Sequence, residues 1–204
     1  MNFEKILENA FYLLAILNPA SKVMFLSTYN PKLTRQQNLE LSWKSSLAAL
    51  LILILLAGFG EFVLMKIFRV QLYSLQLVGG FVLLLMGITA IREGRFVQQR
   101  ENDLRNNFTE ISLVPLAAPL IAGPGMIAAA IAGCAADGWV STSASIFIAI
   151  LINFILMLFS GAINFFLTKT HTLGPLIRLT GLIIAAVAMQ MMITGIKKAF
   201  GMAL

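Results

Sequence analysis

The sequence predicts an all-α membrane protein with six transmembrane helices, arranged as two inverted three-helix repeats in which the first helix of each repeat is broken. Of the 204 residues, 59% are hydrophobic and 12% are charged, and the mean hydropathy is +0.88. A soluble domain of this size cannot bury so much apolar surface, so the chain needs lipid as its solvent. In addition, two apolar segments are interrupted in the same way, at Asn18-Pro19 and at Gly123-Pro124-Gly125, half a chain length apart.

Six apolar segments are candidate spans, each of which needs about 20 residues to cross a bilayer. In chain order they are Ala10–Thr28, Ser45–Met65, Leu72–Ile91, Leu113–Ala136, Gly138–Thr168 and Leu179–Ile196. The first follows Lys5 as the core of a signal peptide would, but Glu4 and Glu8 are acidic and no small-x-small cleavage site follows. We therefore expect it to be the first span.

The two interruptions are costly inside lipid. Proline removes a backbone donor and glycine loosens a helix, so each break frees carbonyls and amides that lipid cannot satisfy. Such backbone persists only where it faces protein, water or a ligand. A single Asn-Pro is more often a structural kink, but two matched breaks favour a ligand site.

The only long polar connection divides the chain into two halves. We predict a first three-helix repeat at 1–91, a polar linker at 92–110 and a second three-helix repeat at 111–204. Because each half has an odd number of spans, a duplicated half lies upside down relative to its partner. The run Leu77–Gly80 in the third span also parallels Leu179–Leu182 in the sixth in order and character.

Basic residues in short loops predict the orientation of the chain. One side receives Lys22, Lys32, Arg35, Lys44, Arg92, Arg95, Arg100, Arg105, Lys169 and Arg178, and the other receives Lys5, Lys66, Arg69, Lys197 and Lys198. We therefore predict a multi-pass protein with both termini outside the cytoplasm. Lys22, three residues past the first break, could snorkel to the surface or face the substrate, and snorkelling is the favoured expectation. The net charge of +6 comes from the basic residues that orient the chain in the membrane, and it does not indicate a nucleic-acid partner.

Four segments carry a resemblance to a known family. They are Ile16–Lys22, the proline-rich block Pro115–Gly125, the pair Gly79-Gly80 and the ending Met189–Ile196. Together they resemble the MarC family of integral membrane proteins over nearly the whole chain. The resemblance implies a six-span protein of the cell inner membrane with inverted repeats, and relatives that include a transporter of small neutral amino acids such as glycine and alanine. The chain departs from the family's first motif, N-P-x-G-x-x-P, because Ser21 and Met24 stand at the last two defined positions.

A zwitterionic amino acid would need the two breaks to replace the water around its charges. A half-helix N-terminus offers amides to the carboxylate, and the C-terminus of the preceding half offers carbonyls to the ammonium. The predicted substrate-binding residues are Asn18, Pro19, Ala20, Ser21, Ala122, Gly123, Pro124 and Gly125. Among them, Asn18 and Ser21 supply side-chain donors and acceptors, and Gly123 and Gly125 allow close approach to the backbone.

A second group of residues is assigned to the pathway or to coupling: Glu61, Gly79, Gly80, Thr180, Gly181 and Gln190. The glycines are more typical of tight helix packing, and Thr180 and Gln190 suit hydrogen bonds between helices as well as a pathway. Glu61 could carry a proton, or could simply lie at the membrane interface near Lys66. The candidate coupling ion is a proton or sodium.

No feature of the sequence predicts an enzyme, a cofactor or a metal site. His171 has no Cys, Asp or Glu at ligand spacing, and there is no phosphate-binding loop, paired carboxylate or nucleophile with a histidine partner. An ATP-driven pump or an intramembrane enzyme is therefore disfavoured.

The favoured function is a secondary transporter that holds a small neutral amino acid between broken helices 1 and 4 and works by alternating access. Two alternatives stay open: a channel or exporter for another small uncharged solute, and a membrane subunit that transports nothing. The expected partners are the lipid bilayer and the small solute. The Ala- and Gly-rich helix faces suit packing within one chain or against a second copy.

Overall fold

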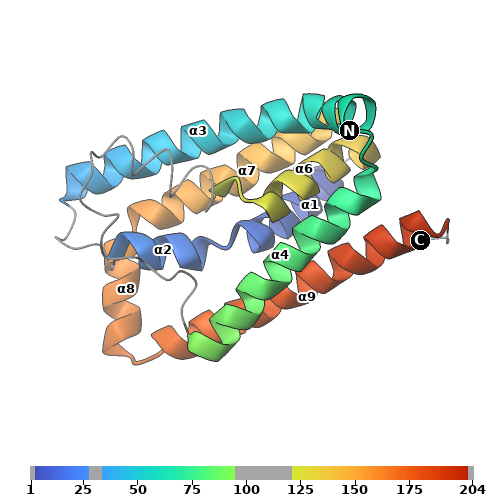
Figure 1. Ribbon diagram of the computed structural model, residues 1–204. Coiled ribbons are helices and arrows are strands. Elements are labelled where there is room, and N and C mark those ends of the chain that lie inside the picture. Colours follow the sequence, from blue (N-terminus) through green and yellow to red (C-terminus); the bar gives the residue numbers. More distant parts are fainter. Residues whose placement is uncertain (1–2, 28–33, 95–120, 202–204) are drawn as a thin grey trace.

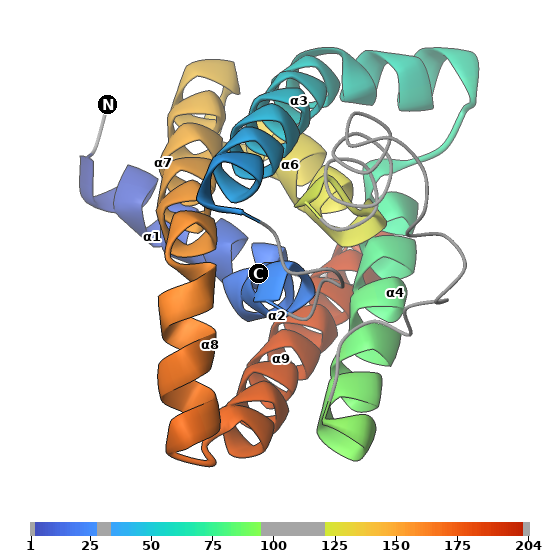
Figure 2. The ribbon, with the colours of Figure 1, turned by 90° about the vertical axis from the view of Figure 1, so that its left-hand side faces the viewer.

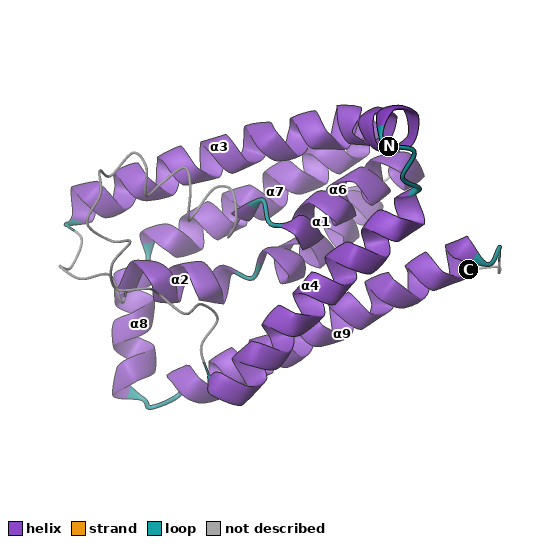
Figure 3. Ribbon diagram, in the orientation of Figure 1, coloured by secondary structure: helices purple, strands orange, loops and turns teal. Residues whose placement is uncertain are grey.

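The computed structural model describes residues 3–27, 34–94 and 121–201, and within them the chain is entirely helical (Figures 1 and 3). In chain order the helices are α1 (Phe3–Leu17), α2 (Pro19–Ser27), α3 (Arg35–Phe62), the short π-helix η1 (Val63–Ile67), α4 (Leu72–Glu93), α6 (Pro124–Asp137), α7 (Trp139–Leu158), α8 (Ser160–Lys169) and α9 (Leu173–Ala199). The predicted linker lies outside the described residues from residue 95 onward.

Four helical stretches are long and apolar enough to cross a membrane: α3 with η1, α4, α7 and α9. A fifth span results if α1 and α2, which are bent by 43° at their junction, count as one. The α6 helix has 14 residues, too few for a span, and residues 95–120 before it fall outside the described part. The predicted all-α membrane fold is confirmed, with four or five candidate spans in the described residues. The fourth predicted span, Leu113–Ala136, stays a prediction, because its first part lies outside the described residues.

The predicted span Gly138–Thr168 is not one continuous helix. It divides into α7 and α8 at Phe159, whose φ of −90° and ψ of 10° depart from helical values. The side-chain amide of Asn38 on α3 lies at this break, where its nitrogen donates to the carbonyls of Met157 and Leu158 at 3.3 and 3.5 Å and to the hydroxyl of Ser160 at 3.3 Å. A contact from another helix therefore stabilises a break that contains no proline.

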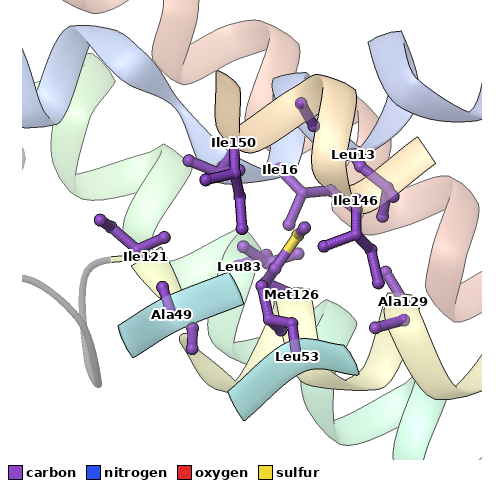
Figure 4. Packing of buried hydrophobic residues seen from close by; sticks show 14 of the residues in the cluster. Leu13, Ile16, Ala49, Leu53, Leu83, Ile121, Met126, Ala129, Ile146 and Ile150 are labelled. Atoms are coloured by element: carbon purple, nitrogen blue, oxygen red, sulfur yellow. The ribbon is translucent and has the colours of Figure 1, made fainter. Parts of the chain in front are cut away.

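Two helices of the second half lie against helices of the first. The α7 helix packs against α1 and α3, and α6 packs against α3 and α4. Figure 1 shows the chain termini at one end of the bundle, whereas α2 and α8 lie at the opposite end, which faces the viewer in Figure 2. One apolar core joins these helices, with Leu53 from α3, Ile146 from α7, Met126 from α6 and Leu83 from α4 at its centre (Figure 4).

The α4 and α9 helices form an antiparallel pair with very close backbones. A Cβ added to Gly80 would lie 2.9 Å from the carbonyl oxygen of Ala188, and one added to Gly87 would lie 2.8 Å from that of Gly181. A Cβ on Gly181 would in turn lie 2.7 Å from the Cβ of Ala90. These contacts leave no room for larger side chains, which is how small residues bring membrane helices together.

Gly181→Leu is therefore expected to lower the melting temperature of the detergent-solubilised protein by several degrees. Overpacking a tight interface typically costs about 1–3 kcal/mol, and here the obstacle is partly backbone, which cannot turn away. Gly161→Leu is the matched control, because a Cβ at Gly161 meets nothing within 4 Å. Equal melting temperatures for the two variants would show that the α4–α9 contact does not limit stability.

Candidate functional site at the two helix breaks

The first break lies at Asn18, between α1 and α2. Asn18 has a φ of +52°, in the left-handed region that asparagine tolerates better than most residues. Its backbone N–H donates to the carbonyl of Leu14 at 3.0 Å, which closes the last turn of α1. Pro19 then begins α2, where its missing N–H costs nothing.

Two side chains from α2 satisfy the carbonyls that this break frees. The backbone N–H and the hydroxyl of Ser21 donate to the carbonyl of Asn18 at 3.2 and 2.8 Å. The ammonium of Lys22 donates to the carbonyl of Leu17. Ser21, predicted to bind substrate, thus holds the break together in this conformation.

Lys22 does not snorkel, so that prediction is wrong. Its side chain is only 2% exposed, and its ammonium lies against the end of α1. The physical reason is that the break places an unpaired carbonyl within reach of a lysine one turn away. The bond joins residues five apart across the break, so the i, i+4 rule for a continuous helix did not indicate it.

The side-chain nitrogen of Asn18 is buried and has no hydrogen-bond partner. Asn18 lines a groove of about 260 Å³ between the first break and α9, together with the predicted residues Pro19, Ala20 and Thr180. The Thr180 hydroxyl already donates within α9, to the carbonyls of Leu176 and Ile177 at 2.9 Å each. The other residues that line the groove are apolar.

The second break precedes α6. Gly123 has extended backbone, with φ −69° and ψ 168°, and Pro124 is the first helical residue. The N-cap residue Gly123 has no side chain that could cap α6, so within the described residues the amides of Gly125 and Met126 lack the partner that an N-cap side chain would give. Gly125 fits closely under α4, since a Cβ there would lie 2.3 Å from Cγ of Leu83.

Both breaks border the same apolar core, through Leu17 at the first and Ile121 and Ala122 at the second (Figure 4 labels Ile16 and Ile121). The remaining predicted residues are spread over the bundle. Gly79 lies against α6, where an added Cβ would be 3.3 Å from the carbonyl oxygen of Pro124. Gly80 and Gly181 lie in the α4–α9 contact, Glu61 is half-buried in the last turn of α3, and Gln190 is exposed.

An ion pair anchors α1 near its start. The Asp137 carboxylate, at the loop between α6 and α7, pairs with the Lys5 ammonium at 2.5 Å and accepts from the Asn9 amide at 2.8 Å. The bond from Lys5 lowers the pKa of Asp137 below its usual value, a larger effect than the opposing one of burial, and the Asn9 bond lowers it further. Sequence reasoning missed this contact because its partners are far apart in the chain.

Metal-ligand groups of three or more His, Cys, Asp or Glu side chains do not occur within residues 3–27, 34–94 and 121–201. What the two breaks offer instead is a buried ammonium, a buried unpaired amide and an uncapped helix N-terminus. All three are hydrogen-bond donors, and each suits an anionic group such as a carboxylate.

Comparisons with known proteins show which family the sequence resembles. The family model described as "MarC family integral membrane protein" matches residues 3–200. A UPF0056 membrane protein of Pyrococcus horikoshii is 33% identical over 192 residues, which cover 94% of this chain and 93% of the relative. The UPF0056 membrane protein YvbG of Bacillus subtilis is 28% identical over 208 residues, which cover 98% of each chain. No solved structure matches the chain.

Proposed function

The chain belongs to the MarC family of integral membrane proteins, and on this premise we propose that it is a secondary transporter of small neutral amino acids such as glycine and alanine. The substrate is held between the two helix breaks. The observation that carries the proposal is the buried pair of donors at the first break, the Lys22 ammonium and the Asn18 amide.

A buried ammonium inside a membrane protein is costly unless an anion or several acceptors surround it. In the described part of the chain, ion pairs join Lys5 to Asp137 and Lys44 to Glu40, and neither involves Lys22. Its bond to the Leu17 carbonyl uses one of three ammonium protons. A substrate carboxylate would accept from a second proton and from the Asn18 amide, which supports recognition of a carboxylate at this break.

The ammonium of the substrate needs carbonyl acceptors, and the Leu17 carbonyl at the end of α1, which accepts from Lys22, is one such acceptor at the first break. We infer an exchange, in which the substrate ammonium replaces Lys22 at this carbonyl while Lys22 turns to the carboxylate. The site then carries the same net charge with and without a neutral amino acid. On this proposal the N-terminus of α6 supplies further amides to the carboxylate.

Alternating access would use the two halves as six spans in inverted repeats. Helix packing supports this arrangement. The α1 helix of the first half packs on α7, as α6 of the second half packs on α3, and the third helix of each half, α4 and α9, pair with each other. If the equivalent helices of the two halves exchange places, the α1–α7 contact becomes the α6–α3 contact, and the α4–α9 contact becomes itself.

The proposed location is the cell inner membrane, with both termini outside the cytoplasm. Arg35, Lys44, Arg92, Lys169 and Arg178 would then be cytoplasmic, which agrees with the excess of basic residues expected on that side. A proton or sodium would drive transport, and Glu61 remains the candidate proton carrier. Assembly with a second copy is compatible with this function.

Counterflow in proteoliposomes tests the proposal, with unlabelled glycine or alanine inside and labelled substrate outside. The parent protein should accumulate label transiently. Asn18→Gly, which keeps the left-handed backbone and removes the amide, should raise the half-saturating concentration about tenfold or more, as expected for a lost hydrogen bond to a charged group.

Gln71→Gly is the control, because it removes an exposed amide from the loop before α4. It should behave as the parent does. A pore for small solutes would equilibrate label without transient accumulation, and a subunit that transports nothing would show no uptake by any variant. Either result would contradict the proposal.

A further inference from the structure

A second cavity, of about 160 Å³, lies among α1, α4, α6, α7 and α9. The polar residues that line it are Asn9, Tyr12, Gln76, Thr142, Ser145 and Lys198. One water needs about 10–15 Å³, and the volume of this cavity is many times larger. It is therefore large enough for a small organic molecule.

Two of the lining side chains have buried polar atoms without a partner. Gln76 is 6% exposed and Thr142 is 3% exposed, and neither the Gln76 Oε1 atom nor the Thr142 hydroxyl has a hydrogen bond. Leaving such a group unsatisfied costs about 1–3 kcal/mol, so native structures rarely do so without a reason. The neighbouring side chains are already engaged, since Asn9 donates to Asp137 and Ser145 donates to the Ile6 carbonyl at 3.0 Å.

The position of the cavity connects it to the breaks. On α1 its lining residues precede Asn18, and on α6 they follow Gly123, starting at Ala129. Exposed Ala136 and Lys198 place its mouth at the end of the bundle that carries the chain termini. A solute that moved from this face toward the breaks would pass through it.

We propose that this cavity is a second substrate-binding chamber, in which Gln76 Oε1 and the Thr142 hydroxyl accept hydrogen bonds from the ammonium of a small zwitterion. This inference rests on the proposed transport function. Lys198 at the mouth favours the carboxylate and repels the ammonium, so the zwitterion enters with its ammonium inward.

The volume of about 160 Å³ sets an upper limit on substrate size. The residues of α6 that line the chamber are Ala129, Ala132, Gly133 and Ala136, so no large side chain of α6 fills the space. A Cβ on Gly133 would lie 3.4 Å from Thr142 Cγ2 and 3.5 Å from its hydroxyl, so any larger group would intrude on the ammonium position. The chamber therefore suits glycine, alanine or serine better than amino acids with long side chains.

Thr142→Val and Gln76→Met test the chamber, since both replacements keep the side-chain volume and remove the acceptor. We expect each to raise the half-saturating concentration of glycine about five- to tenfold for uptake from the face with the termini, with the maximal rate retained. Thr89→Val is the control, because the Thr89 hydroxyl donates to Leu85 in its own helix, away from the cavity.

Gly133→Val supplies a second readout that does not depend on hydrogen bonding. It should impair serine uptake more than glycine uptake, whereas a purely structural defect would impair both equally. An unchanged half-saturating concentration of glycine in both Thr142→Val and Gln76→Met would overturn the proposal of a second binding chamber and indicate that water fills the cavity. If the parent itself shows no counterflow, the transport function fails first, and the chamber fails with it.

Discussion

Lys22→Met is expected to abolish amino-acid counterflow while leaving the protein at least as stable as the parent. The Lys22 ammonium is buried at the first break with the Leu17 carbonyl as its hydrogen-bond partner. Desolvation of a buried ion costs several kcal/mol, and removing the charge removes this cost, which exceeds the cost of about 1–3 kcal/mol for leaving the Leu17 carbonyl without its partner. A loss of transport without a loss of stability would therefore assign the ammonium to substrate binding.

The measurement pairs initial counterflow rates with melting temperatures in detergent. Lys22→Arg should recover part of the activity, because it keeps the charge but changes its shape. Lys44→Met is the control, since Lys44 pairs with Glu40 on the exposed face of α3. If Lys22→Met melted several degrees lower and still transported at the parental rate, the ammonium would be a structural support of the break and nothing more.

Gly125→Ala is expected to displace the second break and to reduce both stability and transport. The added Cβ would lie 2.3 Å from Leu83 Cγ and 2.4 Å from its Cδ1, well inside contact distance. Leu83 is itself 4% exposed and part of the core, so it has little room to move. Overpacking of this kind costs about 1–3 kcal/mol, against which the helical preference for alanine returns about 1 kcal/mol at most.

Leu83→Ala in the same protein provides the test of mechanism. The double variant should recover much of the transport lost by Gly125→Ala, because the space vacated by Leu83 accepts the new methyl group. Gly174→Ala is the control, as nothing lies within 4 Å of a Cβ there. If the double variant were as inactive as Gly125→Ala alone, the close contact between α4 and the second break would not explain the defect.

The features that could be predicted from the sequence are those that depend on residues close together in the chain. Charge-free apolar runs predicted α7 and α9 as spans, and the positions of Asn18 and Gly123 at helix ends followed from proline and glycine chemistry. The division of α7 from α8 could not be predicted in this way. It contains no proline and depends on Asn38, which the fold brings from another helix.

The candidate site shows the same distinction. The sequence indicated the backbone of both breaks, but it did not indicate that the freed carbonyls would be satisfied by Ser21 and Lys22. The second chamber could not be foreseen either. Gln76 and Thr142 look like ordinary polar residues near span ends, and only the packing of five helices brings both residues to the lining of one cavity.

The bond between Lys22 and the Leu17 carbonyl has a consequence for the stoichiometry of transport. A carrier whose empty site exposes unpaired polar groups is restricted to one-for-one exchange, because the empty form cannot change between its outward-open and inward-open states. Here the chain supplies its own ammonium when no cargo is present. On the proposed function, the empty carrier can therefore return unloaded, and net flux down a concentration gradient becomes accessible without an exchanged partner.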